Sequence, residues 1–534
     1  MQATVGSNPT PSATSLRVAH VFDHASHLAA SATSGDSGIV TNHRLSNDPR
    51  ALTRSKHTQL SLGSHSQPYD GQALIADPIH GYISFTVPYA IPDQQEQTEK
   101  DLIDSAWMQR LRYIYQLQSA HWVYPAAEHS RFQHSLGAMH LAGRFAIHLY
   151  PTLAQIVRDV PSQPYLEELF RVAALVHDIG HGPFCHFFDH HYLSRFCLSH
   201  ERIGQEIIRS CLGSVIQRIV RSPSGDFRSG ERLDPDHVAY LILKDPRKST
   251  KGYPRWLTML QPILGGVYTA DNFDYVLRDS YMCGVAVGPI DIDRLIHYTL
   301  ITPSGLTLHH AGLPALQMFL NARMYLYSNV YYHRTTRAID IHLQEIFGKT
   351  MRYLFPYNPL DRLDAYLELT DWSVIETVRA WRREHHRIKR RLGMEWAHVL
   401  NRSVKWKMAY GTTLPIPNDH RARFMTSQYL ERHIRQALPR ALKDLEFRID
   451  LAHQDPRPIN LLNMGNYQIF VYNAGTRTVE KESLQRFFEY LPAWIVQFRI
   501  FSRHHLYDSD LAIAAERVLR DHGLLEPCPS TTTH

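Results

Sequence analysis

Hydrophobic residues recur every three or four positions over much of this chain, a spacing that predicts a mostly α-helical protein. The pattern is strongest in RFQHSLGAMHLAGRFAIHLY, which starts at Arg131, and in LEELFRVAALVHDIG, which starts at Leu166. The second segment is apolar on nearly every side as far as His177, after which Gly180 and Gly182 end it. Both segments are therefore predicted to be buried helices.

Other stretches predict strands near both ends of the folded region and further helices between them. LIADPIHGYISF has the β-branched and aromatic content of short strands around a Pro and Gly turn, so the folded region should begin at Ala73. LEFRID, PINLLNM and YQIFVYN alternate like strands within residues 441–475. Helices are expected in SAWMQRLRYIYQL, with Asp104 as its N-cap, and over residues 265–283, 314–350 and 351–400.

Composition divides the chain into five parts. Residues 1–70 are rich in Ser, Thr, Ala, His, Gly and Asn and have little apolar periodicity, so we expect them to be disordered. The remaining parts are a folded helical core over 71–350, a basic helical extension over 351–440, a small mixed α/β lobe over 441–520 and a frayed tail over 521–534.

Overall composition excludes several classes of protein. With 44% hydrophobic and 20% charged residues among 534, the chain is neither collagen-like nor disordered throughout. It has no apolar run of 18 residues and no basic-then-apolar leader, so we expect neither a membrane-spanning helix nor a secretory signal. The five cysteines contain no C-x-x-C pair, which predicts free thiols in a cytoplasmic protein.

The net charge of +6 is distributed unevenly. Residues 379–450 carry 17 basic and 7 acidic side chains, a net +10, which leaves −4 for the rest of the chain. Any surface that attracts anions should therefore include this stretch.

The strongest chemical signal is His177-Asp178 at the end of the second buried helix. Consecutive helical side chains point about 100° apart, so these two converge only on something lying between them, such as a metal ion. His134 adds an imidazole on an apolar stripe, and Asp271 opens a polar stripe in DNFDYVLRDS. Taken singly, each is more simply a satisfied core or surface side chain. Together they form a mixed nitrogen and oxygen set suited to Fe, Mn, Zn or Co, among which spacing does not choose.

A histidine-rich loop follows the second buried helix. HGPFCHFFDHH contains His181, His186 and Asp189, and His200 comes soon after. Imidazoles have pKa values near about 6.5, which suits general acid and base catalysis at neutral pH. Cys185 lies in the same loop, where packing of a small side chain is favoured over a role as nucleophile.

Six separated motifs between about Ala73 and Met351 carry a resemblance to a known family. R-F-Q-H-S-L-G, H-D-I-G-H-G-P-F and D-N-F-D-Y-V-L-R-D resemble the HD superfamily of metal-dependent phosphohydrolases. D-P-I-H-G-Y-I-S-F, M-Q-R-L-R-Y-I-Y-Q-L and S-H-E-R-I-G make the chain similar, more narrowly, to the deoxynucleoside triphosphate triphosphohydrolases. The fold implied is a mostly α-helical HD core with a smaller mixed α/β C-terminal lobe.

The resemblance implies an activity and the residues that perform it. Such enzymes cleave dGTP and other dNTPs to deoxynucleoside and inorganic triphosphate, as water attacks the α-phosphorus and an imidazolium assists departure of the 5′ oxygen. The implied ligands of a divalent transition metal are His134, His177, Asp178 and Asp271. The implied catalytic shell is His181, His186, Asp189 and His200, with His186 as the candidate acid and Mg on the substrate phosphates.

Further positions match the substrate site of that family. The resemblance implies that the triphosphate is held by Arg131, Arg323, Tyr331, His333 and Arg334. It places Gln116 and Leu117 against the sugar, Tyr275 stacked near it, and Asp279 in the same pocket. Helical spacing puts Arg323, Tyr327, Tyr331 and Arg334 on one stripe, which also describes an ordinary amphipathic face.

A regulatory site is implied at Asp104, Gln109 and Arg112, where a related enzyme reads guanine between subunits. GTP or a dNTP would then activate a homo-oligomer, a dimer or a tetramer. The same residues also read as an N-cap and an ordinary helix surface. Two departures are Asn272, where that relative has a phosphate-binding Lys, and Ala76, where it has an Asn.

Two alternatives stay open. The same metal shell could cleave phosphodiesters in single-stranded or small cyclic nucleotides. Alternatively, the chain is a non-catalytic nucleotide sensor or nucleic-acid-binding protein that uses residues 379–450 as its electrostatic footprint. In that stretch Trp381, Trp396 and Trp406 either stack on bases or, more ordinarily, are buried. No membrane partner is expected.

Overall fold

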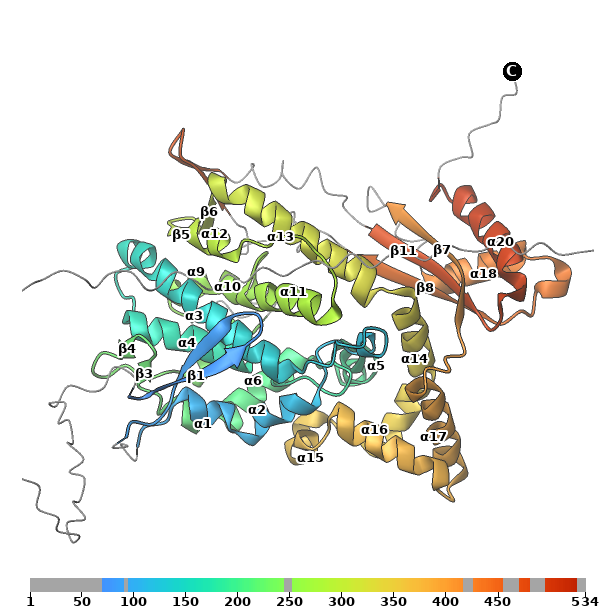
Figure 1. Cartoon of the computed structure of the whole chain (residues 1–534), viewed down its shortest axis with the longest axis horizontal. Coiled ribbons are helices and arrows are strands. Elements are labelled where there is room, and N and C mark those ends of the chain that lie inside the picture. The colour runs from blue at the N-terminus through green and yellow to red at the C-terminus, as the bar shows by residue number, and fades with distance from the viewer. Residues whose placement is uncertain are drawn as a thin grey trace, which may run out of the picture. The chain divides into compact units, whose positions relative to one another are not determined.

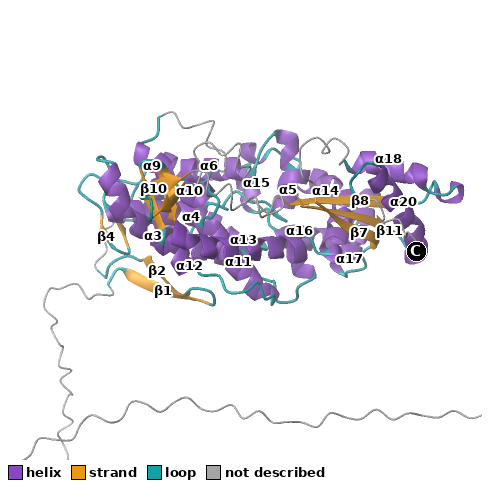
Figure 2. Cartoon of the chain, turned by 90° about the horizontal axis from the view of Figure 1, so that it is seen from above, coloured by secondary structure: helices purple, strands orange, loops and turns teal. Residues whose placement is uncertain are grey.

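The computed structural model describes residues 70–90, 95–243, 252–415, 426–454, 470–480 and 495–525. The predictions for residues 1–69, for the PINLLNM strand and for the end of the C-terminal tail fall outside these ranges. Within them the prediction of a mostly helical protein with a smaller strand-containing C-terminal region is confirmed (Figures 1 and 2).

The described chain opens with the predicted pair of short strands. β1 (Gln72–Asp77) and β2 (Gly81–Thr86) pair antiparallel. Asp77 closes the turn between them, because its Oδ1 accepts the backbone N–H groups of Ile79 at 2.9 Å and His80 at 3.0 Å. Asp77 thus stabilises the predicted Pro and Gly turn through its side chain.

The next two helices are short, and the prediction of Asp104 as an N-cap is wrong. Asp104 is the C-cap of α1 (Glu99–Ile103), and its carboxylate pairs with Lys100 at 2.5 Å. The N-cap of α2 (Ala106–Arg110) is Ser105, which has extended backbone angles and accepts a backbone N–H. A 3-10 turn follows α2 directly, so the helix that was expected to continue ends here.

The two predicted buried helices form the centre of the core. α3 (Arg131–Ile156) packs along α4 (Gln163–Val176), and α11 (Ala270–Cys283) packs against α3. The Ser162 side chain caps α4, and α4 ends at His177 as predicted. α4 therefore ends directly before the His177-Asp178 pair, and the loop of histidines follows.

The predicted helical stretch 314–350 is divided in two. α13 (Leu313–Leu326) runs into a π-helical turn at Tyr327–Tyr331, and α14 (Arg334–Leu354) begins after it. A π turn shifts the side chains that follow it around the axis. The other short elements of the core are α5 (His186–His191), α6 (His200–Ser210), α7 (Gly213–Ile216), α8 (Pro235–Leu241), α9 (Arg255–Leu260), α10 (Pro262–Gly265), α12 (Ile292–His297), β3 (Arg221–Ser222) and β4 (Gly225–Asp226).

The C-terminal part contains strands and a second hydrophobic core. An antiparallel sheet has the order β7-β11-β8, and another sheet has the order β10-β9-β6-β5 with β6 and β9 parallel. The second core draws on side chains from Leu414 to Leu524. The elements concerned are β5 (Thr299–Thr302), β6 (Gly305–His309), β7 (Lys407–Pro415), α18 (Ser427–Ala437), β8 (Phe447–Gln454), β9 (Phe470–Asn473), β10 (Thr478–Glu480), β11 (Ile495–Ser502) and α20 (Asp508–Asp521).

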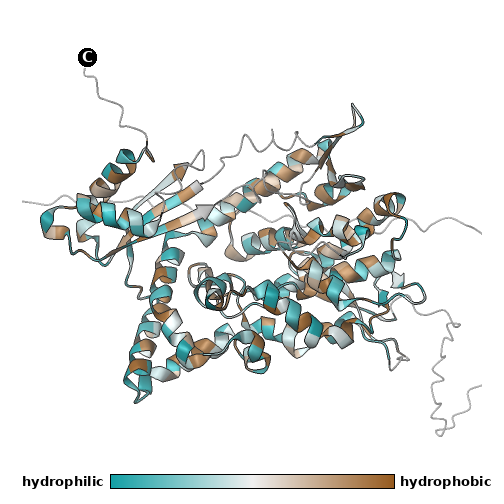
Figure 3. Cartoon of the chain, turned by 180° about the vertical axis from the view of Figure 1, so that it is seen from behind, coloured by the Kyte–Doolittle hydropathy of each residue, from teal (hydrophilic) through white to brown (hydrophobic). Residues whose placement is uncertain are grey.

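The predicted basic helical extension over 351–440 contains three helices whose apolar side faces the large core. They are α15 (Leu363–Leu367), α16 (Asp371–Ala380) and α17 (Arg387–Leu400). Trp381, Trp396 and Trp406 are buried there, so their rings are not available for stacking on bases. Hydrophilic and hydrophobic residues alternate along these helices (Figure 3). Among the described helices, none combines the length and apolar character needed to cross a bilayer.

Candidate metal centre and active site

The structure brings the four predicted metal ligands together from three helices. Nε2 of His134 lies 3.3 Å from Nε2 of His177 and 3.1 Å from Oδ1 of Asp271. Nε2 of His177 lies 3.3 Å from Oδ1 of Asp178 and 3.7 Å from Oδ1 of Asp271. The first and last of these residues, His134 and Asp271, lie more than 130 positions apart in the sequence, yet the donor atoms of all four surround one point.

The other ring nitrogen of each histidine is already used. Nδ1 of His134 lies 2.8 Å from Oδ2 of Asp274, and Nδ1 of His177 lies 2.7 Å from the carbonyl oxygen of Ala174. Both oxygens accept, so both Nδ1 atoms carry a proton and the Nε2 atoms are left to bind either a proton or a metal ion. Two lone pairs and two carboxylates that face each other repel unless a cation lies between them, and this donor set fits a divalent transition metal.

Asp274, which the sequence pattern did not single out, holds the ring of His134 in place. It is fully buried and also accepts from His80 at 2.7 Å and from Arg278 at 2.8 and 2.9 Å. Gly137 makes room for it, since a Cβ at that position would lie 1.8 Å from Oδ1 of Asp274. The available signal was the second Asp of the D-N-F-D motif, three positions after the predicted ligand.

Charge at the centre is balanced by close pairs. Burial alone would raise the pKa of Asp178, but the charges of Arg131 and His177 hold that pKa well below its usual range. Burial would lower the pKa of His134, whereas its hydrogen bonds to Asp271 and Asp274 raise it to about 10. The carboxylates of Asp178, Asp271 and Asp274 therefore stabilise a positive charge between the two histidines, which a proton or a metal ion supplies.

The predicted histidine shell also forms one cluster beside the metal centre. Oδ2 of Asp189 lies 2.5 Å from Nδ1 of His200 and 3.4 Å from Nδ1 of His186. The His181 and His200 rings stack with centroids 3.6 Å apart. Nε2 of His181 lies 3.4 Å from Oδ1 of Asp178, which connects the shell to the metal ligands.

The members of this shell differ in their ability to carry a proton. Burial, together with the charges of Arg131 and His200, holds the pKa of His181 well below its usual range, so His181 is neutral. Burial would raise the pKa of Asp189, but hydrogen bonds from His186 and His200 lower it, so Asp189 is ionised. The side chain of His186 is 54% exposed and lies beside that carboxylate, which favours its protonated form.

The histidine shell is positioned by a close approach between the backbone of the loop after α4 and the backbone of α6. A Cβ at Gly180 would lie 2.0 Å from the carbonyl oxygen of His200 and 2.4 Å from the backbone nitrogen of Gly204. Only glycine allows the loop after α4 to pack so closely against α6, and this packing places His200 over the His181 ring. Burial raises the pKa of the Cys185 thiol to about 12, which opposes its use as a nucleophile.

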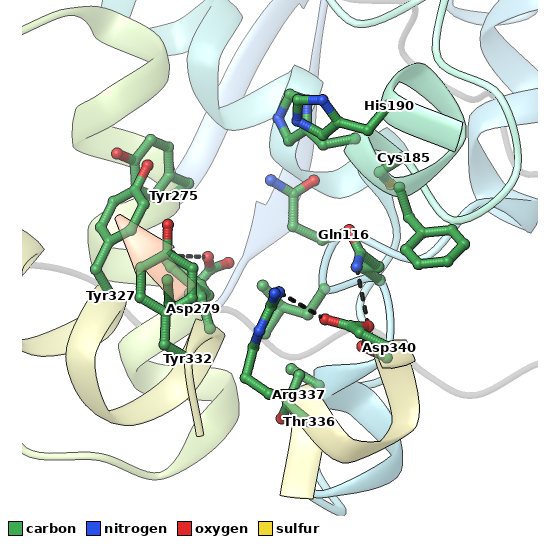
Figure 4. A pocket seen from close by; sticks show the side chains of 18 of the residues that line it. Gln116, Cys185, His190, Tyr275, Asp279, Tyr327, Tyr332, Thr336, Arg337 and Asp340 are labelled. Carbon is green, nitrogen blue, oxygen red and sulfur yellow. Dashed lines mark hydrogen bonds and ion pairs between the residues drawn. The ribbon is translucent and has the colours of Figure 1, made fainter. Parts of the chain in front are cut away.

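Two adjoining cavities open from the metal centre. The smaller, of about 310 Å³, is lined by His134, Asp178 and Asp271 among others, and the larger has a volume of about 520 Å³. They share the walls Gln116, Arg131, His186, Tyr275 and Tyr327. In Figure 4, Tyr275, Tyr327 and Asp279 lie on one side of the larger cavity and Arg337 and Asp340 on another.

Most of the predicted substrate residues line these cavities. They are Gln116, Leu117, Arg131, Tyr275, Asp279, Arg323 and Tyr331. His333 instead caps the start of α14, and Arg334 is exposed, so neither lines the two cavities. The π turn that separates α13 from α14 ends the predicted stripe before Arg334. Tyr327, a member of the predicted stripe, also lines the larger cavity, as do Arg337 and Asp340, which were not predicted as substrate residues.

The three residues of the predicted regulatory site lie on the surface near α2. Nε of Arg112 donates to Oε1 of Gln109 at 2.7 Å, and Arg112 also lies over the Phe132 ring at 3.8 Å. Asp104 is exposed and pairs with Lys100.

Comparison with known families identifies this architecture. Residues 131–273, which contain all four predicted metal ligands, match the profile of the HD domain. The chain contains an HD domain. Residues 290–395 of this HD-domain protein match a second profile, described as an HD associated region. The HD domain marks a metal-dependent hydrolase, and the structure contains His and Asp groups that could hold the metal.

Individual relatives agree with this assignment. The HD-domain protein is 27% identical over 333 residues to the uncharacterized protein YwfO of Bacillus subtilis. The aligned region covers 59% of this chain and 68% of YwfO. The HD-domain protein is also 27% identical over 362 residues to the deoxynucleoside triphosphate triphosphohydrolase SAMHD1 of Gallus gallus, covering 62% and 56%. It thus spans about half the length of several relatives that it matches. A crystal structure of a hypothetical protein from Aquifex aeolicus shares the fold, with a TM-score of 0.59, 23% identity and coverage of 84% and 100%.

Proposed function

We propose that this HD-domain protein hydrolyses deoxynucleoside triphosphates, dGTP among them, to deoxynucleoside and inorganic triphosphate. The observation that carries this proposal is the opening of the His134, His177, Asp178 and Asp271 cluster into two joined cavities of nucleotide size. The similarity to triphosphohydrolases over more than half of the chain supports the choice of substrate.

The four clustered residues would hold a divalent transition metal. When bound, such an ion makes water more acidic at neutral pH and withdraws negative charge from a phosphate. The protein contributes the fixed orientation of both imidazoles, because Asp274 and the Ala174 carbonyl hold their Nδ1 atoms.

His186 is proposed as the general acid. Its ring lines both cavities, and the ionised Asp189 at 3.4 Å stabilises its imidazolium. The reaction breaks the bond between the α-phosphorus and the 5′ oxygen, and the proton of His186 passes to that oxygen. The neutral, buried His181 is unsuited to this step.

The cavity walls offer matching contacts for the substrate. Oε1 of Gln116 and Nη1 of Arg323 are buried and have no hydrogen-bond partner within the described part of the chain, so a polar ligand would satisfy them. Oδ2 of Asp279 accepts from Tyr331 at 2.5 Å, and its Oδ1 lies 2.9 Å from Nε2 of His129. That carboxylate is held in place to accept a sugar hydroxyl.

We further propose that a guanine nucleotide, GTP or a dNTP, activates the enzyme at Asp104, Gln109 and Arg112 in a dimer or tetramer. The exposure of Asp104 and Arg112 and the contact of Gln109 with Arg112 support this site. The free thiols at Cys185, Cys197, Cys211 and Cys283 support a cytoplasmic location.

Product analysis tests the proposal. Purified protein is incubated with Mn and each dNTP, with and without GTP, and the products are separated by ion exchange. Inorganic triphosphate with deoxynucleoside is the expected result. His177→Ala with Asp178→Ala should abolish it, and the surface control Asp293→Asn should not. Release of nucleoside monophosphate would instead establish phosphodiesterase chemistry at the same centre. If no substrate is consumed, the triphosphohydrolase proposal is wrong and the non-catalytic nucleotide-binding alternative is favoured.

A further inference from the structure

A separate cavity of about 530 Å³ lies between the end of α16 and the side of α17. Arg379, Arg382 and Arg383 contribute guanidinium groups to its lining, and Asn401 contributes an amide. None of the metal ligands or substrate residues lines it. It is therefore independent of the proposed hydrolase site.

Tight packing fixes the backbone beneath these arginines. Trp381–Arg383 forms a 3-10 turn that lies directly on α17. A Cβ at Gly393 would lie 2.6 Å from the backbone nitrogen of Arg382, so only glycine permits this approach. Trp381 is buried under the turn, which leaves Arg382 and Arg383 exposed above it.

The three guanidinium groups lack a neutralising partner. Within the ranges that the structure describes, no carboxylate or carbonyl pairs with Arg379, Arg382 or Arg383, and all three are exposed. Like charges gathered around one cavity repel each other, so binding of an anion there is favourable. Planar guanidinium groups match the oxygens of phosphate in particular.

Positive charge continues along α17 beyond the cavity. Residues 379–391 contain seven Arg or Lys and one acidic residue, Glu384. Arg387, Arg390 and Arg391 are exposed within the first five residues of α17, which span roughly 6 Å. With the three arginines of the cavity they make six guanidinium groups. A single small anion does not contact that many groups, whereas a chain of phosphodiesters contacts several of them in turn.

An exposed aromatic ring lies beside the same turn. Tyr353 is 40% exposed, and its ring packs edge-on against His386 at 5.4 Å and against Trp381 at 6.2 Å. A ring at the margin of a cationic surface can stack on an unpaired base, which a duplex does not offer.

We propose that the cavity of Arg379, Arg382 and Arg383, together with the basic side of α17, binds the backbone of single-stranded nucleic acid. Phosphate contacts supply the affinity, so binding is independent of sequence and weakens steeply with salt. Tyr353 adds a stacking contact for one base.

Fluorescence anisotropy of the full chain with a labelled single-stranded oligonucleotide tests this proposal at increasing NaCl. The triple variant Arg379→Ala, Arg382→Ala and Arg383→Ala should bind at least tenfold more weakly in low salt. Each lost phosphate contact lowers the slope of log K against log salt by about 0.7, so the slope should fall by about 2. Tyr353→Ala should weaken binding with the slope unchanged.

The matched control removes three exposed arginines elsewhere, by Arg432→Ala, Arg517→Ala and Arg520→Ala. It changes the net charge equally and should leave affinity and slope close to those of the unaltered chain. Equal losses in the two triple variants would overturn the proposal, as would tighter binding of a duplex of the same sequence. Thermal shifts with inorganic triphosphate check for a small-anion site, and a shift lost in the first variant while oligonucleotide binding persists would also refute it.

Discussion

The buried carboxylate of Asp274 gives the sharpest test of how the metal centre is held. Asp274→Asn keeps the size of the side chain but removes the charge that accepts from His134, His80 and Arg278. Despite burial, Arg278 and the hydrogen bonds from the two histidines hold the pKa of Asp274 well below its usual range, so the change removes a full negative charge. His134 then loses the partner that fixes its ring and its tautomer.

Two effects of this substitution have known sizes. Loss of a carboxylate that supports a ligating histidine lowers metal affinity about 10–100-fold, or about 1.4–2.8 kcal/mol. Breaking a buried ion pair from one side costs about 3–5 kcal/mol of folding stability. The second cost is reduced here, because Arg278 keeps a contact of 2.8 Å to Asp77.

Asp77→Asn is the matched control, since Asp77 also pairs with Arg278 but has no contact with His134. Metal affinity is measured by competition with a chelator of known affinity, and folding stability by urea denaturation of the metal-free protein. We expect both variants to lose stability and only Asp274→Asn to lose metal affinity. Unchanged metal affinity in Asp274→Asn, or an equal loss in Asp77→Asn, would refute the reasoning.

Further predictions concern the acid, the metal, the pocket and pH. His186→Gln should lower turnover about 10²–10⁴-fold with metal content unchanged by atomic spectroscopy, and loss of metal would make His186 a ligand instead. Chelation should lower the melting temperature, because an ion at 100 times its Kd contributes about 2.7 kcal/mol; an unchanged melting temperature on chelation contradicts a bound ion. Asn272→Lys adds a cation to the smaller cavity and should lower KM for dNTPs in steady-state assays, whereas an unaltered KM would mean that the side chain does not reach the phosphates. Burial and the charge of His80 lower the pKa of His140 to about 4 in the folded protein. Between this pKa and the ordinary histidine pKa of about 6.5, the unfolded chain is therefore protonated at His140 and the folded chain is not. Stability should therefore rise from pH 4 to about 6.5, by roughly 3 kcal/mol at most. Urea denaturation should show His140→Gln flattening that rise, and an equally steep profile would exclude this histidine.

Sequence patterns were sufficient for the parts of the molecule that depend on local chemistry. α3 and α4 follow from apolar residues spaced at three and four, and the end of α4 at His177 follows from the glycines after it. The strands β1 and β2 follow from β-branched residues around a Pro and Gly turn. The motifs that contain His134, His177, Asp178 and Asp271 identified the candidate ligands before any distance was known.

Tertiary structure alone decided which side chains share a partner. The contact between Asp274 and His134 depends on how α11 packs against α3. The exclusion of His333 and Arg334 from the cavities depends on the π turn between α13 and α14, which has no clear signal in the local sequence pattern. The N-cap Ser105 was missed because Asp and Ser are both good caps, and backbone angles select between them. Helical periodicity records which side of a helix is buried, but the distance between two buried sides is set by the whole core.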